Sequence, residues 1–166
     1  MTQLFASPSQ TQESDERYTP SWIFDGLGIT FDTDPASPEA GGDYVPAHRK
    51  ITALEDGLTA EWYGCVWLNP PFSNATPWAR RFVSHGQGVF LGPVANSAWC
   101  TDLMAASGVV WFMRDLPFVH PDHAGKRSSM PLFMAAVGAD EVSAVSGLAL
   151  SGRHEGALLV PFRVAS

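Results

Sequence analysis

The feature that most constrains the fold of this chain is a pair of adjacent prolines, Pro70 and Pro71, placed directly after a short apolar run. That run, residues 64–68, has the pattern of a buried β-strand. Proline lacks a backbone N–H, its ring fixes φ, and it restricts the residue before it. A strand therefore has to end at Asn69, and the chain has to turn there.

The rest of the sequence alternates between strand and helix patterns. Strand-like runs cover residues 29–34, 64–68, 88–91, 109–113, 132–137 and 157–162, and helical patterns cover 20–27, 76–85 and 97–107, with a weaker one between the last two strands. Residues 35–47 and 114–130 have loop compositions. Strands that alternate with helices predict an α/β fold, with a mostly parallel sheet and helices on both faces.

Two helix starts share one pattern, a threonine followed by a proline. Thr19-Pro20 and Thr76-Pro77 each predict a threonine cap with the proline at the first helical position. Gly28 and Gly86 are predicted to end these two helices, because glycine adopts the left-handed conformation at low cost.

Length and composition indicate one folded domain. The chain has 166 residues, of which 45% are hydrophobic and 16% charged, enough apolar side chains for a real core. We expect residues 18–166 to form this domain and residues 1–17, which are polar and acidic, to be a flexible lead-in. No apolar run approaches the ~20 residues that cross a bilayer, and the lead-in does not resemble a secretory signal.

The two cysteines, Cys65 and Cys100, lie in apolar patterns, which favours buried thiols over a disulfide. Without a secretory signal, a reducing cytoplasm is the expected location. The four tryptophans in strand or helix patterns are expected to lie in the core; they are Trp67, Trp78, Trp99 and Trp111.

The charge is unevenly distributed. Residues 1–76 hold three Lys/Arg and eleven Asp/Glu, a balance of −8, whereas residues 77–166 hold seven and six, a balance of +1; the whole chain carries −7. A broad basic surface is therefore excluded, and any nucleic-acid contact is expected to use a local patch in the second half.

The tetrapeptide Asn69-Pro70-Pro71-Phe72 can act on an electron-poor amino group. The side-chain carbonyl of Asn69 and the backbone carbonyl of Pro70 are two acceptors held in a stiff turn, and Phe72 adds an aromatic face. Two acceptors bonded to the hydrogens of an aromatic amine favour a pyramidal nitrogen, and the ring can stack on the base. The alternative is a plain turn that ends a strand.

In its motifs the sequence resembles the phage-type DNA N-6-adenine methyltransferase family. The resemblance rests on the tetrapeptide and on ordered flanks over about residues 18–135: Thr19-Pro20-Ser21-Trp22-Ile23-Phe24, Phe31-Asp32-Thr33-Asp34-Pro35-Ala36-Ser37, Trp62 to Phe72, and Trp78. It implies a compact, abbreviated Rossmann-like methyltransferase fold with S-adenosylmethionine as methyl donor. It further implies that Asn69, Pro70, Pro71 and Phe72 are catalytic.

The resemblance also implies a cofactor site beside the tetrapeptide. Its candidate residues are Thr19, Pro20, Asp32, Asp34, Pro35, Ala36, Asp56 and Asn69. The glycine-rich loop usual for this cofactor in larger methyltransferases is missing, since Ser37-Pro38-Glu39-Ala40 precedes Gly41-Gly42. Asp32, Asp34 and Asp56 can alternatively be ordinary acids of surface loops.

A base inside a duplex cannot reach such a site, so the target adenine is expected to flip out of double-stranded DNA. The residues expected to contact DNA are Arg80, Arg81, Arg114, His120, His123, Lys126 and Arg127; ordinary solvated charges are the alternative. His120 and His123 lack partners that would complete a metal site, so no metal is expected.

Several functions remain open at this stage. The acceptor can also be cytosine N4, an RNA base or a protein glutamine, and the chain can also be a non-catalytic nucleic-acid-binding module. The family resemblance favours DNA adenine. It implies a phage or prophage origin, a bacterial host cytoplasm and a role in protection from host restriction.

Overall fold

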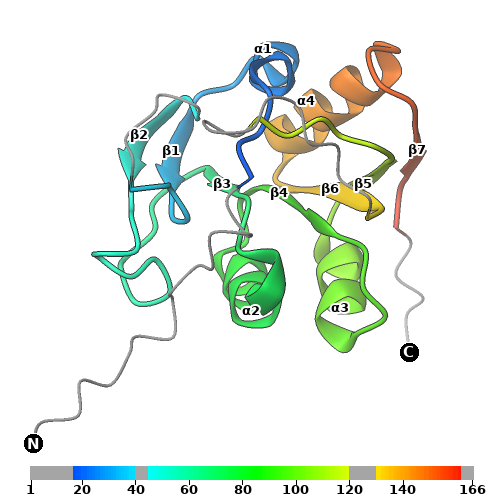
Figure 1. Ribbon diagram of the computed structural model, residues 1–166. Coiled ribbons are helices and arrows are strands. Elements are labelled where there is room, and N and C mark those ends of the chain that lie inside the picture. Colours follow the sequence, from blue (N-terminus) through cyan, green and yellow to red (C-terminus); the bar gives the residue numbers. More distant parts are fainter. Residues whose placement is uncertain (1–16, 40–44, 120–129, 162–166) are drawn as a thin grey trace, which may run out of the picture.

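A computed structural model describes residues 17–39, 45–119 and 130–161 (Figure 1). The predicted lead-in up to residue 16 lies outside these ranges, as do residues 40–44, 120–129 and 162–166. The elements in chain order are α1 (Ser21–Leu27), β1 (Phe31–Asp34), β2 (Ala47–Lys50), β3 (Val66–Leu68), the 3-10 turn η2 (Phe72–Asn74), α2 (Ala75–His85), β4 (Gly88–Pro93), α3 (Ala98–Ala106), β5 (Val109–Met113), β6 (Leu132–Val137), α4 (Ala139–Leu150) and β7 (Gly156–Leu159).

The strands form one seven-stranded sheet in the order β2-β1-β3-β4-β6-β5-β7. The strands β2, β1, β3 and β4 run parallel, and β6 is inserted antiparallel between β4 and β5, with β7 antiparallel at the far edge. The expected α/β fold is confirmed, and the sheet with its helices is compatible with a Rossmann-like methyltransferase fold. Strand β2 was not predicted; it begins at Ala47, the last residue of the segment 35–47 that was assigned to a loop.

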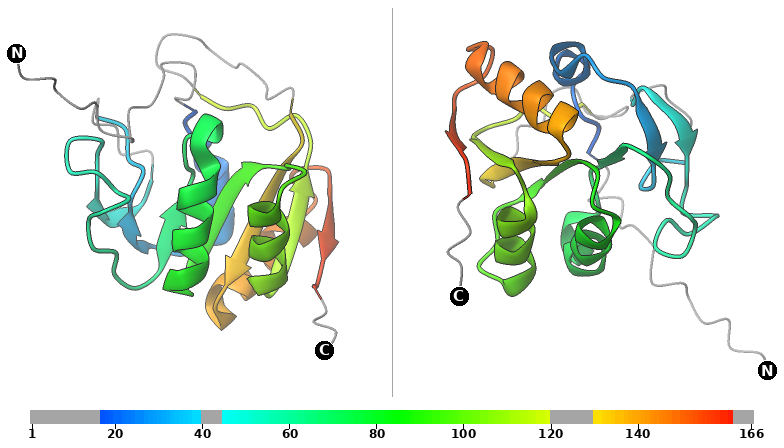
Figure 2. Two further views of the ribbon diagram at one scale, coloured as in Figure 1. Left: turned by 90° about the horizontal axis from the view of Figure 1, so that it is seen from below. Right: turned by 180° about the vertical axis from the view of Figure 1, so that it is seen from behind.

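The helices cover both faces of the sheet, α1 and α4 on one and α2 and α3 on the other (Figures 1 and 2). Alternate residues of each central strand point to opposite faces, so each face has its own apolar cluster. Phe31, Trp67 and Trp111 pack under α1 and α4, whereas Phe90 and Phe133 pack under α2 and α3. The sheet is therefore buried on both sides, as its apolar strands require.

The observed helix ends match the predicted helix ends only in part. Gly28 and Gly86 end α1 and α2 in the left-handed conformation, as predicted. The threonine caps were wrong: Pro20 occupies the N-cap position of α1, and α2 begins at Ala75, which places Thr76 inside the helix. The hydroxyl of Thr19 is used elsewhere, beside Asn69.

The predicted core tryptophans are buried, since Trp67, Trp78, Trp99 and Trp111 expose 8% or less of their surface. Cys65 and Cys100 are free thiols, half-buried and buried respectively. Within the part of the chain that the structure describes, no helix combines the length and the apolar character needed to cross a bilayer.

Candidate active site

The tetrapeptide lies where β3 ends, in the middle of the sheet. Pro70 and Pro71 are buried, whereas Asn69 and Phe72 stay partly exposed. Because β1, β3 and β4 are parallel, their carboxyl ends meet at one edge, which is where ligands bind in open α/β sheets. Residues 69–72, which the sequence predicts to be catalytic and which are here called the catalytic turn, therefore present one polar and one aromatic side chain at this edge.

The side chain of Asn69 has a fixed orientation. Its Nδ2 donates a hydrogen bond to the backbone carbonyl of Arg17 at 2.8 Å, and it lies 3.4 Å from Oγ1 of Thr19. Thr19 itself is buried. Because the amide nitrogen is held by the segment that precedes α1, Oδ1 is the atom of this carboxamide left to accept a hydrogen bond from a ligand.

Phe72 lies between two neighbours contributed by distant parts of the chain. The guanidinium carbon of Arg17 lies 4.6 Å from the centroid of the Phe72 ring, and Phe118 meets the same ring at 6.1 Å and 73°. The backbones of Tyr18 and Val119 exchange two hydrogen bonds, of 3.0 and 2.8 Å. An isolated bridge thus joins the N-terminal segment to the segment after β5, directly beside the catalytic turn.

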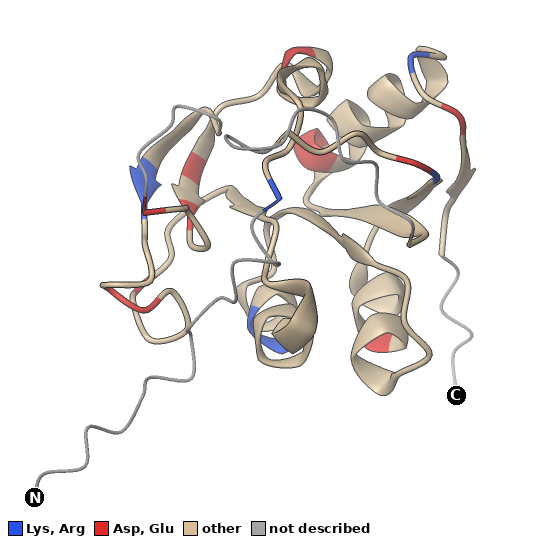
Figure 3. Cartoon of the chain, in the orientation of Figure 1, with Lys and Arg blue, Asp and Glu red and all other residues tan. Residues whose placement is uncertain are grey.

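Asp34 ends β1, one strand away from the catalytic turn. Its side chain is almost fully buried, and this burial raises its pKa to about 7. A hydrogen bond from the Ala36 N–H at 3.3 Å, the Ser37 side chain and the charge of Lys50 act in the opposite direction. Figure 3 shows the basic residues of β2 beside the acidic residues of β1.

The carboxylates of Asp32 and Asp56 accept backbone N–H groups instead. Oδ2 of Asp32 accepts the N–H of Cys65 at 2.7 Å, just before β3 begins. That contact lies at the opposite end of the strand from the catalytic turn. Asp56 has a positive φ of 59°, and its Oδ1 accepts the N–H of Leu58 at 3.1 Å. Asp32 therefore joins β1 to the start of β3, and Asp56 holds a local turn. Of the acids proposed from the sequence, Asp34 is the one buried at the end of its strand.

Residues 56–62 form a loop that packs against the end of β1. An added Cβ on Gly57 would lie 1.8 Å from the Pro35 carbonyl oxygen, so the two backbones are in close contact. The Trp62 indole N–H donates to the Gly57 carbonyl at 2.7 Å, and its ring stacks on Trp78. Loop and strand end therefore form one unit around Pro35, a predicted cofactor residue.

Arg81 holds this loop from α2. Its guanidinium donates to the carbonyls of Leu58 and Ala60 and lies 4.6 Å from the Trp62 ring centroid. Its three partners all belong to the protein. Arg80, one residue earlier, is exposed. Both arginines were predicted from the sequence to contact DNA, but their surroundings in the structure differ.

The remaining predicted DNA contacts are separated from this pair. Arg114 is exposed just after β5, and its carbonyl lies 2.5 Å from Nε2 of His154. The predicted contacts His120, His123, Lys126 and Arg127 lie outside the described residues. In Figure 3 the described basic residues lie on several separate elements. Within the described ranges, no three His, Cys, Asp or Glu residues lie together in a cluster suited to a metal ion.

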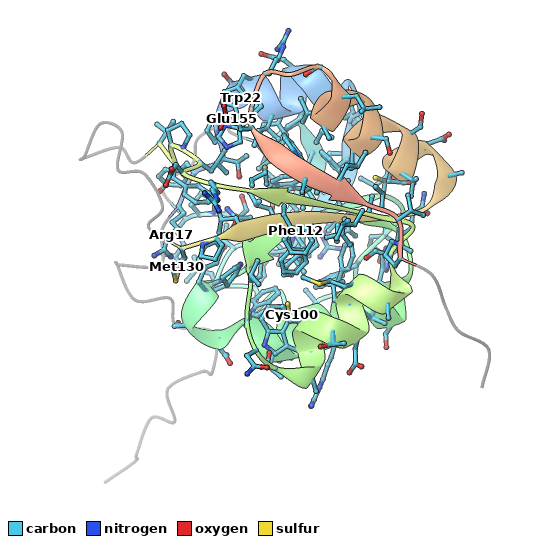
Figure 4. The ribbon with its side chains drawn as sticks, turned by 90° about the vertical axis from the view of Figure 1, so that its right-hand side faces the viewer. Arg17, Trp22, Cys100, Phe112, Met130 and Glu155 are labelled. Atoms are coloured by element: carbon cyan, nitrogen blue, oxygen red, sulfur yellow. The ribbon has the colours of Figure 1, made fainter. Side chains whose placement is uncertain are left out.

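Three residues at the catalytic turn were not proposed from the sequence: Arg17, Tyr18 and Phe118. Figure 4 shows Arg17 at the same end of the molecule as Met130, which precedes β6. Arg17 had been assigned to the lead-in, and Phe118 falls in a segment assigned to an exposed loop. The aromatic and aliphatic residues among 116–119 were a usable signal, because Leu116 and Phe118 are buried.

Comparison with known proteins identifies the family of this chain. Residues 6–143 match the family model described as DNA N-6-adenine-methyltransferase (Dam). A protein of Haemophilus phage HP1 named DNA N-6-adenine-methyltransferase is 35% identical over 83 residues, which are 46% of this chain and 46% of that relative. The aligned region thus spans about half the length of the curated relative, and no solved structure matches the chain. Because the family model covers most of the sequence, including the catalytic turn, the chain belongs to the DNA N-6-adenine-methyltransferase family.

Proposed function

We propose that this protein transfers the methyl group of S-adenosylmethionine to the N6 amino group of an adenine that has flipped out of double-stranded DNA. The orientation of Asn69 is the observation that supports this most strongly. Its amide nitrogen is bonded to the Arg17 carbonyl, so its oxygen is directed to a partner that donates hydrogen. The amino group of adenine is such a donor, and family membership supports the same substrate.

The catalytic turn activates this amine without a strong base. Oδ1 of Asn69 and the backbone carbonyl of Pro70 each accept one N6 hydrogen, which favours a pyramidal nitrogen with an available lone pair. The two prolines keep the acceptors in place, so little reorganisation is needed during the reaction. Phe72 stacks on the base, and the surplus proton leaves after methyl transfer.

The end of β1 has the chemistry that a cationic methyl donor requires. S-adenosylmethionine supplies an electrophilic methyl group on a positively charged sulfur. Asp34 is a carboxyl group at the strand end whose burial raises its pKa to about 7, so a part of it is ionised at neutral pH, and the charge of Lys50 favours that ionised form. The indole N–H of Trp78 is buried and has no hydrogen-bond partner among the described residues. The acceptor and the unused donor fit the cofactor, and Thr19, Pro20, Pro35, Ala36 and the loop with Asp56 complete the proposed site.

DNA contacts are proposed for the exposed arginines Arg80 and Arg114, together with His120, His123, Lys126 and Arg127. These groups would bind phosphates while the flipped base is at Phe72. Bacterial cytoplasm is where such a phage-type enzyme meets its DNA, and protection of that DNA from restriction is the proposed role. The phage relative supports this setting.

The decisive experiment supplies the full chain with labelled S-adenosylmethionine and duplex DNA, then digests the DNA to nucleosides. Label in N6-methyldeoxyadenosine is expected. Asn69→Ala should lose nearly all transfer while keeping the circular dichroism of the wild type. Phe72→Ala should lose less, since stacking contributes ~1–3 kcal/mol per base.

Parallel reactions with RNA and with a glutamine-containing protein, and the cytosine fraction of the same digest, test the other acceptors. Label in one of these and none in adenine would reject the proposed substrate. Cofactor binding without transfer to any acceptor would indicate a binding module.

A further inference from the structure

The two edges of the sheet differ in their side chains. The edge strand β2 has the sequence Ala-His-Arg-Lys, so three of its four residues are His, Arg or Lys. The other edge strand, β7, has the sequence Gly-Ala-Leu-Leu and continues into Val160, so the run 156–160 holds no charge. Charged side chains on an edge strand oppose pairing with another strand. The sheet is therefore protected against such pairing at β2 and unprotected at β7.

The outer edge of β7 is exposed as well as uncharged. Among the described residues β7 has one strand neighbour, β5, and Figure 4 shows the molecule from this side. Leu159 exposes 53% of its surface and Val160 exposes 60%, whereas Leu158 packs against the core under α1 and α4. The strand is thus anchored on its inner side, and its outward N–H and C=O groups can accept a further strand.

We propose that β7 of one protomer pairs antiparallel with β7 of a second copy, so that two seven-stranded sheets join across a two-fold axis. The pairing is centred on Leu158, because this register matches every residue of the uncharged run 156–160 with another residue of that run. The proposal does not depend on the proposed methyl transfer, so the dimer and the enzymatic activity are tested separately.

The side chains of β7 fit their own two-fold copy. With Leu158 facing the partner's Leu158, Ala157 faces the partner's Leu159 and Gly156 faces the partner's Val160, so at these two positions a small residue meets a large one. Opposite residues of an antiparallel pair lie on the same face of the sheet, where such size matching lets them pack. The same operation at β2 would place basic side chains against basic side chains, which is destabilising.

The contact is short, which sets the strength of the dimer and its geometry. Tight interfaces use about 20–30 residues a side, whereas the paired run 156–160 is much shorter. We expect a dissociation constant on the order of 10 μM. Because the two-fold axis reverses the strand direction, the carboxyl ends of β3 in the two protomers point to opposite edges of the joined sheet. The two catalytic turns therefore face away from each other.

Sedimentation equilibrium of the full chain, at concentrations on both sides of the expected dissociation constant, tests the pairing. Leu159→Lys should raise the dissociation constant about tenfold, because two-fold symmetry places the changed side chain in two cross-strand pairs. Leu54→Lys is the matched control: it makes the same substitution at a residue that is 86% exposed and follows β2, at the opposite edge of the sheet. It should leave the dissociation constant unchanged, and both variants should keep the circular dichroism of the wild type.

Cross-linking tests the register without a lysine on the strand. Ala157→Cys and Leu159→Cys are mixed under mild oxidation, and the mixture should form a disulfide-linked dimer faster than either variant alone, because residue 157 faces residue 159 of the other copy. The wild type, with free Cys65 and Cys100, gives the background.

A wild type that stays monomeric at every concentration would overturn the proposal. Equal dissociation constants for Leu159→Lys and Leu54→Lys would place the dimer contact away from β7, and cross-linking no faster in the mixture than in the single variants would reject the register. Either result also overturns the pairing as proposed.

Discussion

The amide nitrogen of Asn69 donates to the carbonyl oxygen of Arg17 across 2.8 Å, a contact between residues 52 positions apart in the sequence. This bond decides which atom of the Asn69 side chain faces the ligand. It also attaches the segment before α1 to the catalytic turn, so the polar chemistry of the turn and the packing of the N-terminal segment depend on each other.

Asn69→Asp separates these two functions of the side chain. Aspartate keeps the oxygen acceptors but has no donor, so a carboxylate would face the Arg17 carbonyl. We expect the free energy of unfolding to fall by about 1 kcal/mol, the typical net contribution of one hydrogen bond, and methyl transfer to fall with it. Chemical denaturation measures the first effect; stability equal to that of the wild type would show that this bond contributes little to folding.

Asp34 should make both stability and cofactor binding depend on pH. Its pKa of about 7 lies above the value of an unfolded aspartate, ~3.9. Between these two values the folded state holds a proton that the unfolded state lacks. Stability should therefore fall as pH rises from about 4 to about 7, by at most ~1.4 kcal/mol per pH unit.

The affinity for S-adenosylmethionine should change in the opposite direction to the stability. It should increase as the pH rises from 6 to 7.5, because the ionised carboxylate of Asp34 attracts a cation. Calorimetric titrations at several pH values test this, with Asp34→Asn as the control that should remove the dependence. A dependence that persists unchanged in Asp34→Asn would assign the titration to another group.

Arg80 and Arg81 provide a matched pair. Arg81→Ala removes the donors to the Leu58 and Ala60 carbonyls and the contact with Trp62, so we expect a loss of about 1–3 kcal/mol in stability. Arg80→Ala changes an exposed residue and should alter stability by less than ~0.5 kcal/mol. It should instead weaken DNA binding and lower its salt dependence. Thermal melts and DNA titrations of both variants test the distinction, and equal melting temperatures would contradict it.

Gly57 and Gly147 form a second pair with opposite expected signs. A methyl group on Gly57 would overlap the Pro35 carbonyl oxygen, so Gly57→Ala should lower the melting temperature and displace the proposed cofactor loop. Gly147 lies within α4 with open space around its Cα. Gly147→Ala should stabilise the protein by about 0.5–1 kcal/mol, as expected for alanine in a helix. Destabilisation by both changes would show that the space at Gly147 is not available.

Local patterns identified the elements that build the sheet, but not the contacts that complete the site. The helical pattern over residues 76–85 correctly predicted α2 (Ala75–His85). Strand β2 was missed because Ala47–Lys50 is short, mostly polar and only partly buried. The antiparallel insertion of β6 was missed as well, since strand periodicity contains no information about direction.

Prediction of the candidate site from local sequence patterns has the same limit. The two prolines located the catalytic turn, because their effect on the backbone is local. The hydrogen-bond partners of the Asn69 side chain lie about fifty residues earlier in the sequence. The sequence pattern around Thr19 is the same whether its hydroxyl caps a helix or accepts a hydrogen bond from the Asn69 amide. Arg81 looked like a DNA contact because charge alone does not reveal whether a guanidinium faces solvent or backbone carbonyls.

The bridge between Tyr18 and Val119 also has a consequence for synthesis of the protein. Tyr18 leaves the ribosome about a hundred residues before its partner, so the N-terminal segment cannot dock fully while the chain is still growing. A truncated product that stops before Phe118 would contain the whole of residues 69–72 and still lack one wall of the site. Premature fragments of this protein should therefore lack the proposed methyl transfer.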